Sequence, residues 1–312
     1  MGSSTSAALV RQGPSPPGRL RARPRNVVAR TQGGLVPGVR IVTDSAADLP
    51  ADLVDELGIV VVPLEVRLGD TDAVTTSALS PAEFWELTAS TGAIAQTAAP
   101  APGAFGEAFA GAARDGASAV VCVTLSAKLS ATYQAAVAGA QLAGIPVAVV
   151  DSTTVTMGEG FVVLDAAAAA AGGDDLETVR AAAQTSIATV RVLGALGGLD
   201  ALRRGGRIGG AQAFFGSLLA VKPIVEVRDG VVVGESRQRT RARSLRYLVD
   251  KAVSAGPLRR VAVAHGAAAD LDEFVAMLDA ALPGVDVLVT YIGPVIGAHA
   301  GPGTIGLCLQ RS

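Results

Sequence analysis

Short runs of β-branched and aliphatic residues alternate with helical stretches from Val39 onward, and this alternation constrains the fold more than any other feature of the chain. Strands are expected at residues 39–44, 59–66, 119–125 and 146–151, and helices at residues 50–57, 80–90, 103–114 and 130–143. Continuous apolar strands joined by helices are typical of a parallel sheet that is covered on both faces. Residues 39–157 are therefore predicted to form an α/β domain with a parallel sheet.

The pattern changes after Met157-Gly158. Two Ala-rich helices, at residues 160–171 and 174–187, come first. Strands follow at residues 191–196, 223–228, 231–236, 260–265, 285–292 and 304–309, with helices at 240–254 and 270–281. Asp229-Gly230 separates two of these strands as a two-residue hairpin turn. Residues 158–312 are predicted to form a mixed or largely antiparallel α+β domain, and the cleft between the two domains is the expected ligand site.

Charge is distributed unevenly along the chain. The first 38 residues contain six Arg and no acidic residue, whereas the rest carries 20 basic and 28 acidic side chains, a net charge of −8. An acidic body without a basic stripe argues against nucleic acid as a partner. Residues 1–38 are rich in Pro, Arg, Gly and Ser and are predicted to be a disordered leader, with an organelle transit peptide as the alternative.

The two cysteines, Cys122 and Cys308, lie inside apolar runs, so we expect small buried side chains rather than a disulfide or a metal site. No metal site is expected elsewhere, because the chain has two His and no His-Glu-x-x-His string. A cytoplasmic location follows most simply from this cysteine usage. No run of about 18 apolar residues is present, so we expect no integral membrane insertion.

A hydroxyl-rich turn follows the apolar strand at residues 119–125. The sequence of residues 125–134 is LSAKLSATYQ, and it leads from the strand into a helix. Free backbone N–H groups and the positive end of the helix dipole suit a carboxylate or phosphate at such a turn. The alternative is that Ser130 only caps its helix. Asp44 and Asp151 also follow strands, where they are expected either to meet a ligand or to organise Asx turns.

Three further motifs carry groups that recognise anions. Thr97 is the hydroxyl side chain of a small-residue loop at 96–103, which is either a rigid Pro turn or a way to bring Thr97 beside Ser130. The sequence RRGGRIGG at 203–210 joins flexible Gly pairs to guanidinium groups, although a helix C-cap explains the Gly alone. Four Arg alternate between Arg237 and Arg243 and are predicted to share one side of an extended segment, as a docking surface or a solvated strand end.

The two histidines lie in different contexts. His265 ends a predicted strand, whereas His299 lies in a Gly/Pro loop, where functional residues are more frequent. A Ser/His/Asp hydrolase built from Ser130, His299 and Asp44 or Asp151 is conceivable, although no Gly-x-Ser-x-Gly elbow is present.

Six segments assemble into a recognisable series. They are IVTDSAADLP (41–50), TAAPAPGAF (97–105), LSAKLSATYQ (125–134), VVDSTTVTMGEG (149–160), LRRGGRIGG (202–210) and IGAHAGPGTIG (296–306). In this order they resemble the DegV family of bacterial fatty-acid-binding proteins. The resemblance implies two domains whose interdomain tunnel holds one long-chain fatty acid, with the carboxylate near the surface and no other cofactor. It also implies a non-catalytic role, in which the carboxylate is presented to a separate ATP-dependent fatty acid kinase for phospholipid synthesis.

The motif positions imply roles for particular residues. Thr97 and Ser130 match the hydroxyls that hold the carboxylate, assisted by the backbone N–H of Ala131, with His299 close by. Arg207 and Arg239 match positions that the family uses around phosphoryl transfer and kinase docking. Further candidates are Ser126, His265 and Asp44.

The chain departs from the family pattern near the expected headgroup. Ala98-Ala99 stands where the family commonly has Ser-Gln, and Ser126-Ala127-Lys128-Leu129-Ser130-Ala131 stands where it commonly has Ser-Ser-x-Leu-Ser-Gly. These replacements remove hydrogen-bond donors but keep Thr97 and Ser130. Val74-Thr75-Thr76-Ser77 lies where the family usually has an acidic residue.

Two other classes compete with lipid binding. One is an enzyme, either an acyl-ester hydrolase that uses Ser130 and His299 or a kinase-like domain, since the family's fold resembles that of dihydroxyacetone kinases. A kinase needs its own nucleotide site, and neither a phosphate loop nor clustered Mg²⁺ carboxylates stand out. The other is a structural protein without a ligand, whose cleft would be closed by side chains.

Overall fold

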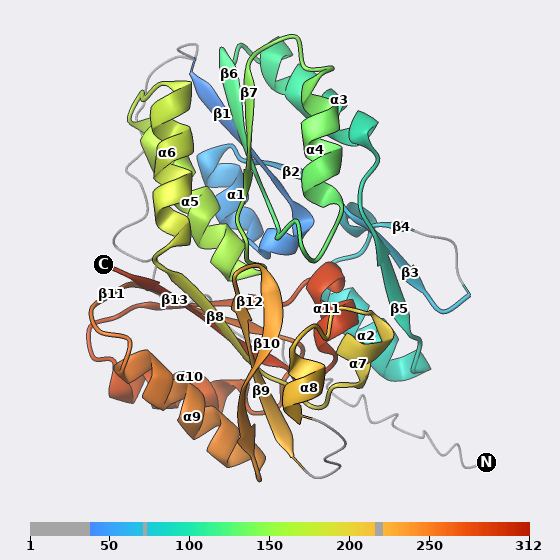
Figure 1. Ribbon diagram of the computed structural model, residues 1–312, viewed down its shortest axis with the longest axis vertical. Helices are drawn as coiled ribbons and strands as arrows, with labels where there is room; N and C mark the ends of the chain where they lie inside the picture. Colours follow the sequence, from blue (N-terminus) through green and yellow to red (C-terminus); the bar gives the residue numbers. More distant parts are fainter. Residues whose placement is uncertain (1–37, 71–73, 216–220) are drawn as a thin grey trace, which may run out of the picture.

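Three β-sheets organise the chain in the computed structural model, which describes residues 38–70, 74–215 and 221–312 (Figure 1). The segment predicted as a leader, residues 1–38, lies outside the described residues except for Gly38. A four-stranded and a three-stranded sheet come from the N-terminal part of the chain, and a six-stranded sheet comes from the C-terminal part. The predicted pairing of an α/β domain with a mixed α+β domain is confirmed.

The four-stranded sheet is parallel throughout, in the order β2-β1-β6-β7. Its strands are β1 (Val39–Asp44), β2 (Val60–Val62), β6 (Ala119–Thr124) and β7 (Val147–Asp151). Helices α3 (Pro102–Arg114) and α4 (Thr132–Ala140) pack on one face. The opposite face is covered by α1 (Ala51–Leu57), α5 (Met157–Ala171) and α6 (Leu176–Ile187).

The single strand predicted at residues 59–66 is wrong, because the chain changes sheet within it. β2 ends at Val62 and β3 (Glu65–Leu68) begins a separate antiparallel sheet, in the order β4-β3-β5. Pro63 lies between them and has no N–H to continue a ladder of hydrogen bonds. The other two strands of this sheet are β4 (Val74–Thr75) and β5 (Ala95–Ala98).

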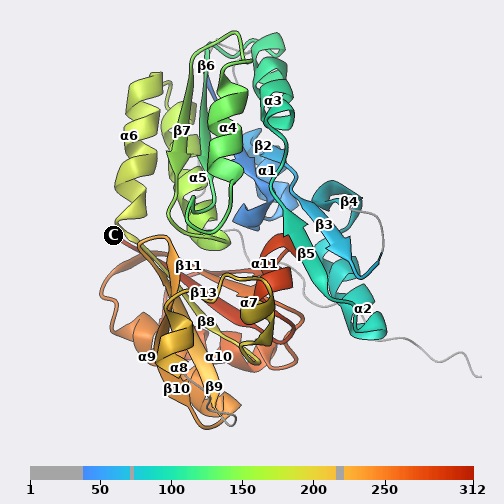
Figure 2. The same ribbon diagram turned by 45° about the vertical axis from the view of Figure 1, so that its right-hand side comes forward.

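Helix α2 (Pro81–Thr91) extends from the small sheet towards the C-terminal domain. It begins at a capping box in which Ser80 and Glu83 satisfy each other's backbone N–H groups. The indole Nε1 of Trp85 donates to the carbonyl of Ile292 at 2.8 Å, and both residues are buried. This part of the N-terminal half therefore contacts the C-terminal half, and Figure 2 shows the two from the side.

The six-stranded sheet has the order β10-β9-β8-β13-β11-β12. Only β11 and β12 are parallel neighbours among its described pairs. The strands are β8 (Val190–Ala195), β9 (Lys222–Arg228), β10 (Val231–Gln238), β11 (Leu258–His265), β12 (Val287–Tyr291) and β13 (Ile305–Arg311). One face packs on α9 (Arg241–Val253) and α10 (Leu271–Ala281).

The predicted hairpin between β9 and β10 is confirmed. Asp229 and Gly230 have φ values of 51° and 79°, the left-handed conformation that a tight two-residue turn requires. The alternating Arg that follow do not share one extended segment, so this prediction is wrong. β10 ends at Gln238, and the Oγ1 of Thr240 accepts from the Arg243 N–H to begin α9.

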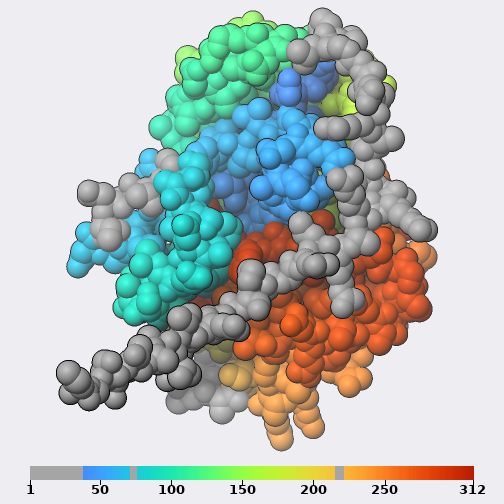
Figure 3. Space-filling model, turned by 180° about the vertical axis from the view of Figure 1, so that it is seen from behind, coloured from blue at the N-terminus to red at the C-terminus, as the bar shows by residue number. Residues whose placement is uncertain are grey.

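Helix α5 lies between the two large sheets. Its residues Met157, Phe161 and Leu164 join Val192 and Cys308 of the six-stranded sheet in one apolar core. Helix α6 packs on β6 and β7, although its residues lie beyond the domain boundary expected at residue 158. This packing favours a boundary after Ile187. Seen from behind, the red and orange C-terminal segments lie directly against the blue N-terminal ones (Figure 3).

Cys122 and Cys308 are both unpaired and fully buried, as expected for small core side chains. In the described parts of the chain, no helix is both long and apolar enough to cross a membrane. The described residues also include the short helices α7 (Asp200–Arg204), α8 (Ala211–Phe215) and α11 (Pro294–Ala300).

Candidate functional site

A cavity opens between the two domains, where α11 meets β5 and the six-stranded sheet. The empty space in it is about 850 Å³, counted together with the open solvent at its mouth. Most of its lining is aliphatic, including Val192, Val225, Val227 and Val232 of the sheet and Leu125 of the opposite domain. The cleft is therefore open, contrary to the expectation for a structural protein without a ligand.

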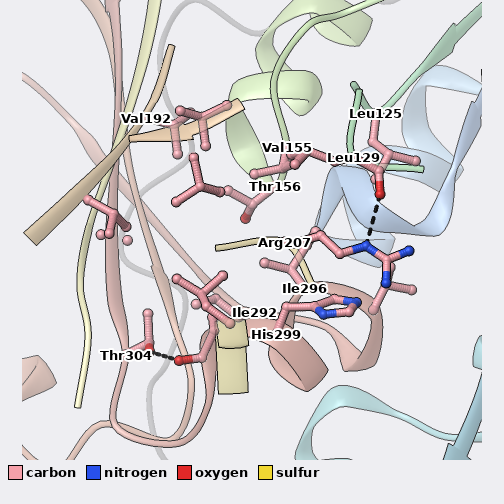
Figure 4. A pocket seen from close by; sticks show the side chains of 18 of the residues that line it. Leu125, Leu129, Val155, Thr156, Val192, Arg207, Ile292, Ile296, His299 and Thr304 are labelled. Carbon is pink, nitrogen blue, oxygen red and sulfur yellow. Dashed lines mark hydrogen bonds between the residues drawn. The ribbon is translucent and has the colours of Figure 1, made fainter. Parts of the chain in front are cut away.

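Polar side chains gather at one part of this cavity. Thr97, Ser130, Arg207 and His299 all line it, and they come from four different segments of the chain. Figure 4 shows Arg207 and His299 next to each other, away from Val192. Thr97 Oγ1 lies 3.0 Å from Nε2 of His299, so two of the predicted headgroup residues are in direct contact. The result is an apolar chamber with a local set of hydroxyl, imidazole and guanidinium groups.

His299 lies in the last turn of α11 rather than in the loop expected from its Gly- and Pro-rich surroundings. Burial, together with the positive charge of Arg207, lowers the pKa of His299 to about 4. The imidazole is therefore neutral at pH 7. Its Nδ1 is buried and has no hydrogen-bond partner among the described residues.

The Gly205 backbone approaches the imidazole closely. A Cβ atom at this position would lie 2.7 Å from His299 Cε1 and closer still to Nδ1, much less than a normal contact. The first Gly of the RRGGRIGG motif thus makes room for the histidine. Gly209, with φ 49°, allows a second close approach, because a Cβ there would lie 2.8 Å from the carbonyl oxygen of Val232.

Ser130 lies just before α4 and lines the cavity. Helix α4 begins at Thr132, with Ala131 rather than Ser130 at the N-cap position. Even so, the Ser130 hydroxyl accepts from the Thr132 N–H at 3.3 Å and lies 2.8 Å from the Thr132 hydroxyl. The same side chain lines the cavity, so Ser130 presents its hydroxyl to it.

Arg207 links the two domains at the same place. Its Nε donates to the carbonyl of Leu129 at 3.1 Å, and Nη1 donates to the carbonyl of Gly205 at 2.6 Å. A guanidinium carries five N–H donors, so Arg207 has donors beyond these two. Figure 4 shows the bond to Leu129, the neighbour of Ser130.

Five other predicted residues lie outside the cavity lining, and one of them is Ala131, the N-cap residue of α4. Arg239 is exposed in the turn between β10 and α9. His265 is buried against Tyr291, with ring centroids 4.3 Å apart, and burial lowers its pKa to about 4. Ser126 is fully buried and donates to the carbonyl of Gly230. Asp44 accepts from the N–H groups of Ala46 and Leu125, at 2.8 and 2.9 Å, and so organises loops.

Asp151 also organises an Asx turn, since its Oδ1 accepts from the N–H groups of Thr153 and Ala127.

The hydrolase triad is consequently not assembled. Ser130 contacts Thr132 and not His299, and both candidate aspartates are engaged with backbone amides. Among the described residues no group of His, Cys, Asp and Glu is arranged to hold a metal ion.

The carboxyl groups of Asp44, Asp48 and Glu159 are buried close to residues that line the cavity. Burial raises the pKa of Asp44 to about 6, that of Asp48 to about 7, and that of Glu159 well above its usual value. Oδ1 of Asp48 accepts from the N–H of Gly293 at 2.9 Å, which is the N-cap residue of α11. Asp48 therefore fixes the start of the helix that carries His299.

Sequence reasoning missed several residues of the site. Gly205 was visible only as part of a flexible motif, and its contact with His299 depends on the distant α11. Gly194 and Gly306 face each other on β8 and β13 and line the cavity. Two glycines inside strands are a signal for close approach of a ligand or another backbone, and could have been noticed.

The family assignment follows from comparison with known proteins. The model of the DegV family of uncharacterised proteins matches residues 38–312. The chain belongs to the DegV family. A DegV domain-containing protein of Streptomyces coelicolor is 38% identical over 276 residues, covering 87% of this chain and 98% of that protein. A DegV domain-containing protein of Mycobacterium tuberculosis is 36% identical, covering 87% and 97%.

Solved structures of DegV proteins share the fold. A DegV family protein from Thermus thermophilus, described by its fatty acid binding, superposes with a TM-score of 0.78 at 31% identity, covering 88% of this chain and 100% of that chain. DegV from Bacillus subtilis, described as a fatty acid binding protein, superposes with a TM-score of 0.79 at 29% identity, covering 89% and 100%. This DegV protein is thus similar over 88–89% of its chain to proteins described as binding fatty acids.

Proposed function

We propose that this DegV protein binds one long-chain fatty acid, with the tail in the interdomain cavity and the carboxylate at Thr97, Ser130, Arg207 and His299. The observation that carries the proposal is the composition of the cavity, whose aliphatic walls meet a local group of anion-binding side chains. Each buried CH₂ of the tail contributes about 0.8 kcal/mol. The tail therefore supplies most of the affinity, and the polar groups select an acid.

The headgroup is held by neutral donors and one cation. If Nε2 of His299 carries the ring proton, it donates to Thr97 Oγ1, and the Thr97 hydroxyl is free to donate to the carboxylate. Ser130 and the Ala131 N–H, at the start of α4, supply further donors. Arg207 supplies the charge that compensates the carboxylate. The acyl-ester hydrolase has less support, because Ser130 has no base beside it.

A separate ATP-dependent fatty acid kinase is the partner in this proposal, and the chain itself catalyses nothing. Arg207 lies at the headgroup, where it would stabilise a phosphoryl group as well as a carboxylate. Arg239 is exposed on the same domain, as a docking residue must be. A cytoplasmic location stays a prediction from the two buried thiols.

Direct titration with palmitate tests the headgroup assignment. Thr97→Val combined with Ser130→Ala is expected to weaken binding at least tenfold, because the bound carboxylate loses two donors. Thr178→Val with Ser254→Ala is the matched control, since both side chains are exposed on helical surfaces outside the cavity lining. Unchanged affinity in the Thr97 and Ser130 variant would refute the assignment.

A further inference from the structure

The loop between β6 and α4, residues 125–131, is the element that presents Ser130, and we name it the headgroup loop. Its own domain holds it through three hydrogen bonds, one of which runs from the N–H of Ser126 to the carbonyl of Thr154 at 2.9 Å. Asp44 Oδ2 accepts from the N–H of Leu125 at 2.9 Å, and Asp151 Oδ1 accepts from the N–H of Ala127 at 3.1 Å. All three contacts lie in the first half of the loop, so they do not reach Ser130.

The C-terminal domain holds the loop at Leu129 through Arg207, and in its first half through the tip of the β9–β10 hairpin. The Ser126 hydroxyl donates to the carbonyl of Gly230 at 2.7 Å, and Lys128 Nζ donates to the carbonyl of Asp229 at 2.9 Å. Figure 1 shows the tip of this hairpin reaching the parallel-sheet domain. The hairpin also forms part of the cavity wall through Val225, Val227 and Val232.

Ser126 occupies the centre of this contact. It is fully buried, and its hydroxyl also accepts from the N–H of Lys128 at 3.2 Å, which shapes the turn that leads to Ser130. The hairpin tip packs tightly on this side chain, because a Cβ atom at Gly230 would lie 2.7 Å from the Ser126 hydroxyl. Ser126 does not line the cavity, so it cannot touch a ligand there.

We propose that Ser126 and the hairpin tip at Gly230 position the headgroup loop, so that the Ser130 hydroxyl is set for the carboxylate. Ser126 is then a positioning residue, and the interdomain contact adjusts headgroup recognition rather than tail burial. The inference rests on the proposed fatty-acid binding. Its consequence is that loss of the contact should cost affinity only for ligands that carry an acid group.

Two ligands of equal chain length separate these effects. Binding of palmitate and of hexadecan-1-ol is measured for the wild-type chain, Ser126→Ala, Ser130→Ala and the double variant. Ser126→Ala is expected to weaken palmitate binding about tenfold and hexadecan-1-ol binding less than twofold. In the Ser130→Ala background, Ser126→Ala is expected to cost less than twofold, since the residue that it positions is gone.

Gly230→Ala tests the contact from the other domain and covers the case in which Ser126→Ala does not fold. It should produce the same selective loss of palmitate binding. Gly284→Ala is its matched control, because Gly284 has a similar φ of 84° but no atom within 4 Å of the added Cβ.

Equal losses for both ligands would overturn the inference, as would an undiminished effect in the Ser130→Ala background or normal palmitate binding by Ser126→Ala and Gly230→Ala. A wild-type chain that binds neither ligand would overturn the proposed function itself. A wild-type chain that binds palmitate, beside variants that bind it equally well, would overturn only the positioning role.

Discussion

Gly205→Ala tests the headgroup site by adding one methyl group next to His299. It removes none of the side chains that are proposed to hold the carboxylate. Gly205 has φ −74° and ψ −6°, which Ala adopts without strain, so the backbone cost is negligible. The added Cβ would lie 2.7 Å from His299 Cε1 and closer to Nδ1, whereas apolar atoms prefer about 3.5–4.0 Å. The imidazole must therefore move by about 1 Å or more.

That movement acts on the contact between His299 and Thr97, which is 3.0 Å long in the intact site. The bond that is lost with it is the one that Thr97 donates to the bound carboxylate, and a hydrogen bond to a charged group contributes about 1.5–3 kcal/mol, so palmitate affinity should fall about 10- to 150-fold. The assay is isothermal titration of palmitate at pH 7.5. Gly198→Ala is the matched control, because its added Cβ meets no atom within 4 Å.

A double variant identifies the cause. In a His299→Ala background the methyl group at position 205 has room, so Gly205→Ala should have no further effect on palmitate binding. The reasoning is refuted if Gly205→Ala binds palmitate as tightly as the wild-type chain. It is refuted equally if the loss persists in the absence of the imidazole.

Two further predictions concern titratable groups. Burial raises the pKa of Asp48 from 3.8 to about 7. The ionisable Asp48 side chain therefore lowers the free energy of unfolding as the pH rises from about 4 to 7, and this loss is constant above pH 7. Asp48→Asn keeps an acceptor for the Gly293 N–H. In urea unfolding it should be more stable than the wild-type chain by about 4 kcal/mol at pH 8, with no such gain at pH 4. Parallel profiles of stability against pH for the two chains would contradict this. The pKa of His299 is lowered to about 4, so the ring stays neutral and palmitate affinity should change less than threefold between pH 8 and 6. A step near pH 6.5 that His299→Gln removes would show instead that the imidazole titrates normally.

Periodicity predicted most of the fold because the buried strands are continuous apolar runs. β6 (Ala119–Thr124) and β13 (Ile305–Arg311) are recognisable on this basis, since nearly every side chain in them is buried. β5 (Ala95–Ala98) was missed, because its alternation is between half-buried and exposed small residues. The assignment of α6 to a layer could not be predicted, since its apolar stripe does not specify which sheet it covers.

The site was predictable only in part. Thr97, Ser130, Arg207 and His299 were singled out by their motifs, and the structure places all four on one cavity. Their contacts were not predictable, because Thr97 and His299 are separated by 202 positions and meet only when α11 packs on β5. The role of Ser126 was hidden for the same reason, since its partner Gly230 belongs to the other domain.

Lipid extraction from the purified protein tests the central claim most directly. The protein is isolated from bacterial cells without detergent, denatured in organic solvent, and its bound lipids are identified and counted by mass spectrometry. We expect close to one long-chain fatty acid per chain, with much less in the variant that combines Thr97→Val with Ser130→Ala. A wild-type protein that releases no fatty acid, and that takes up none when palmitate is added, would contradict the account.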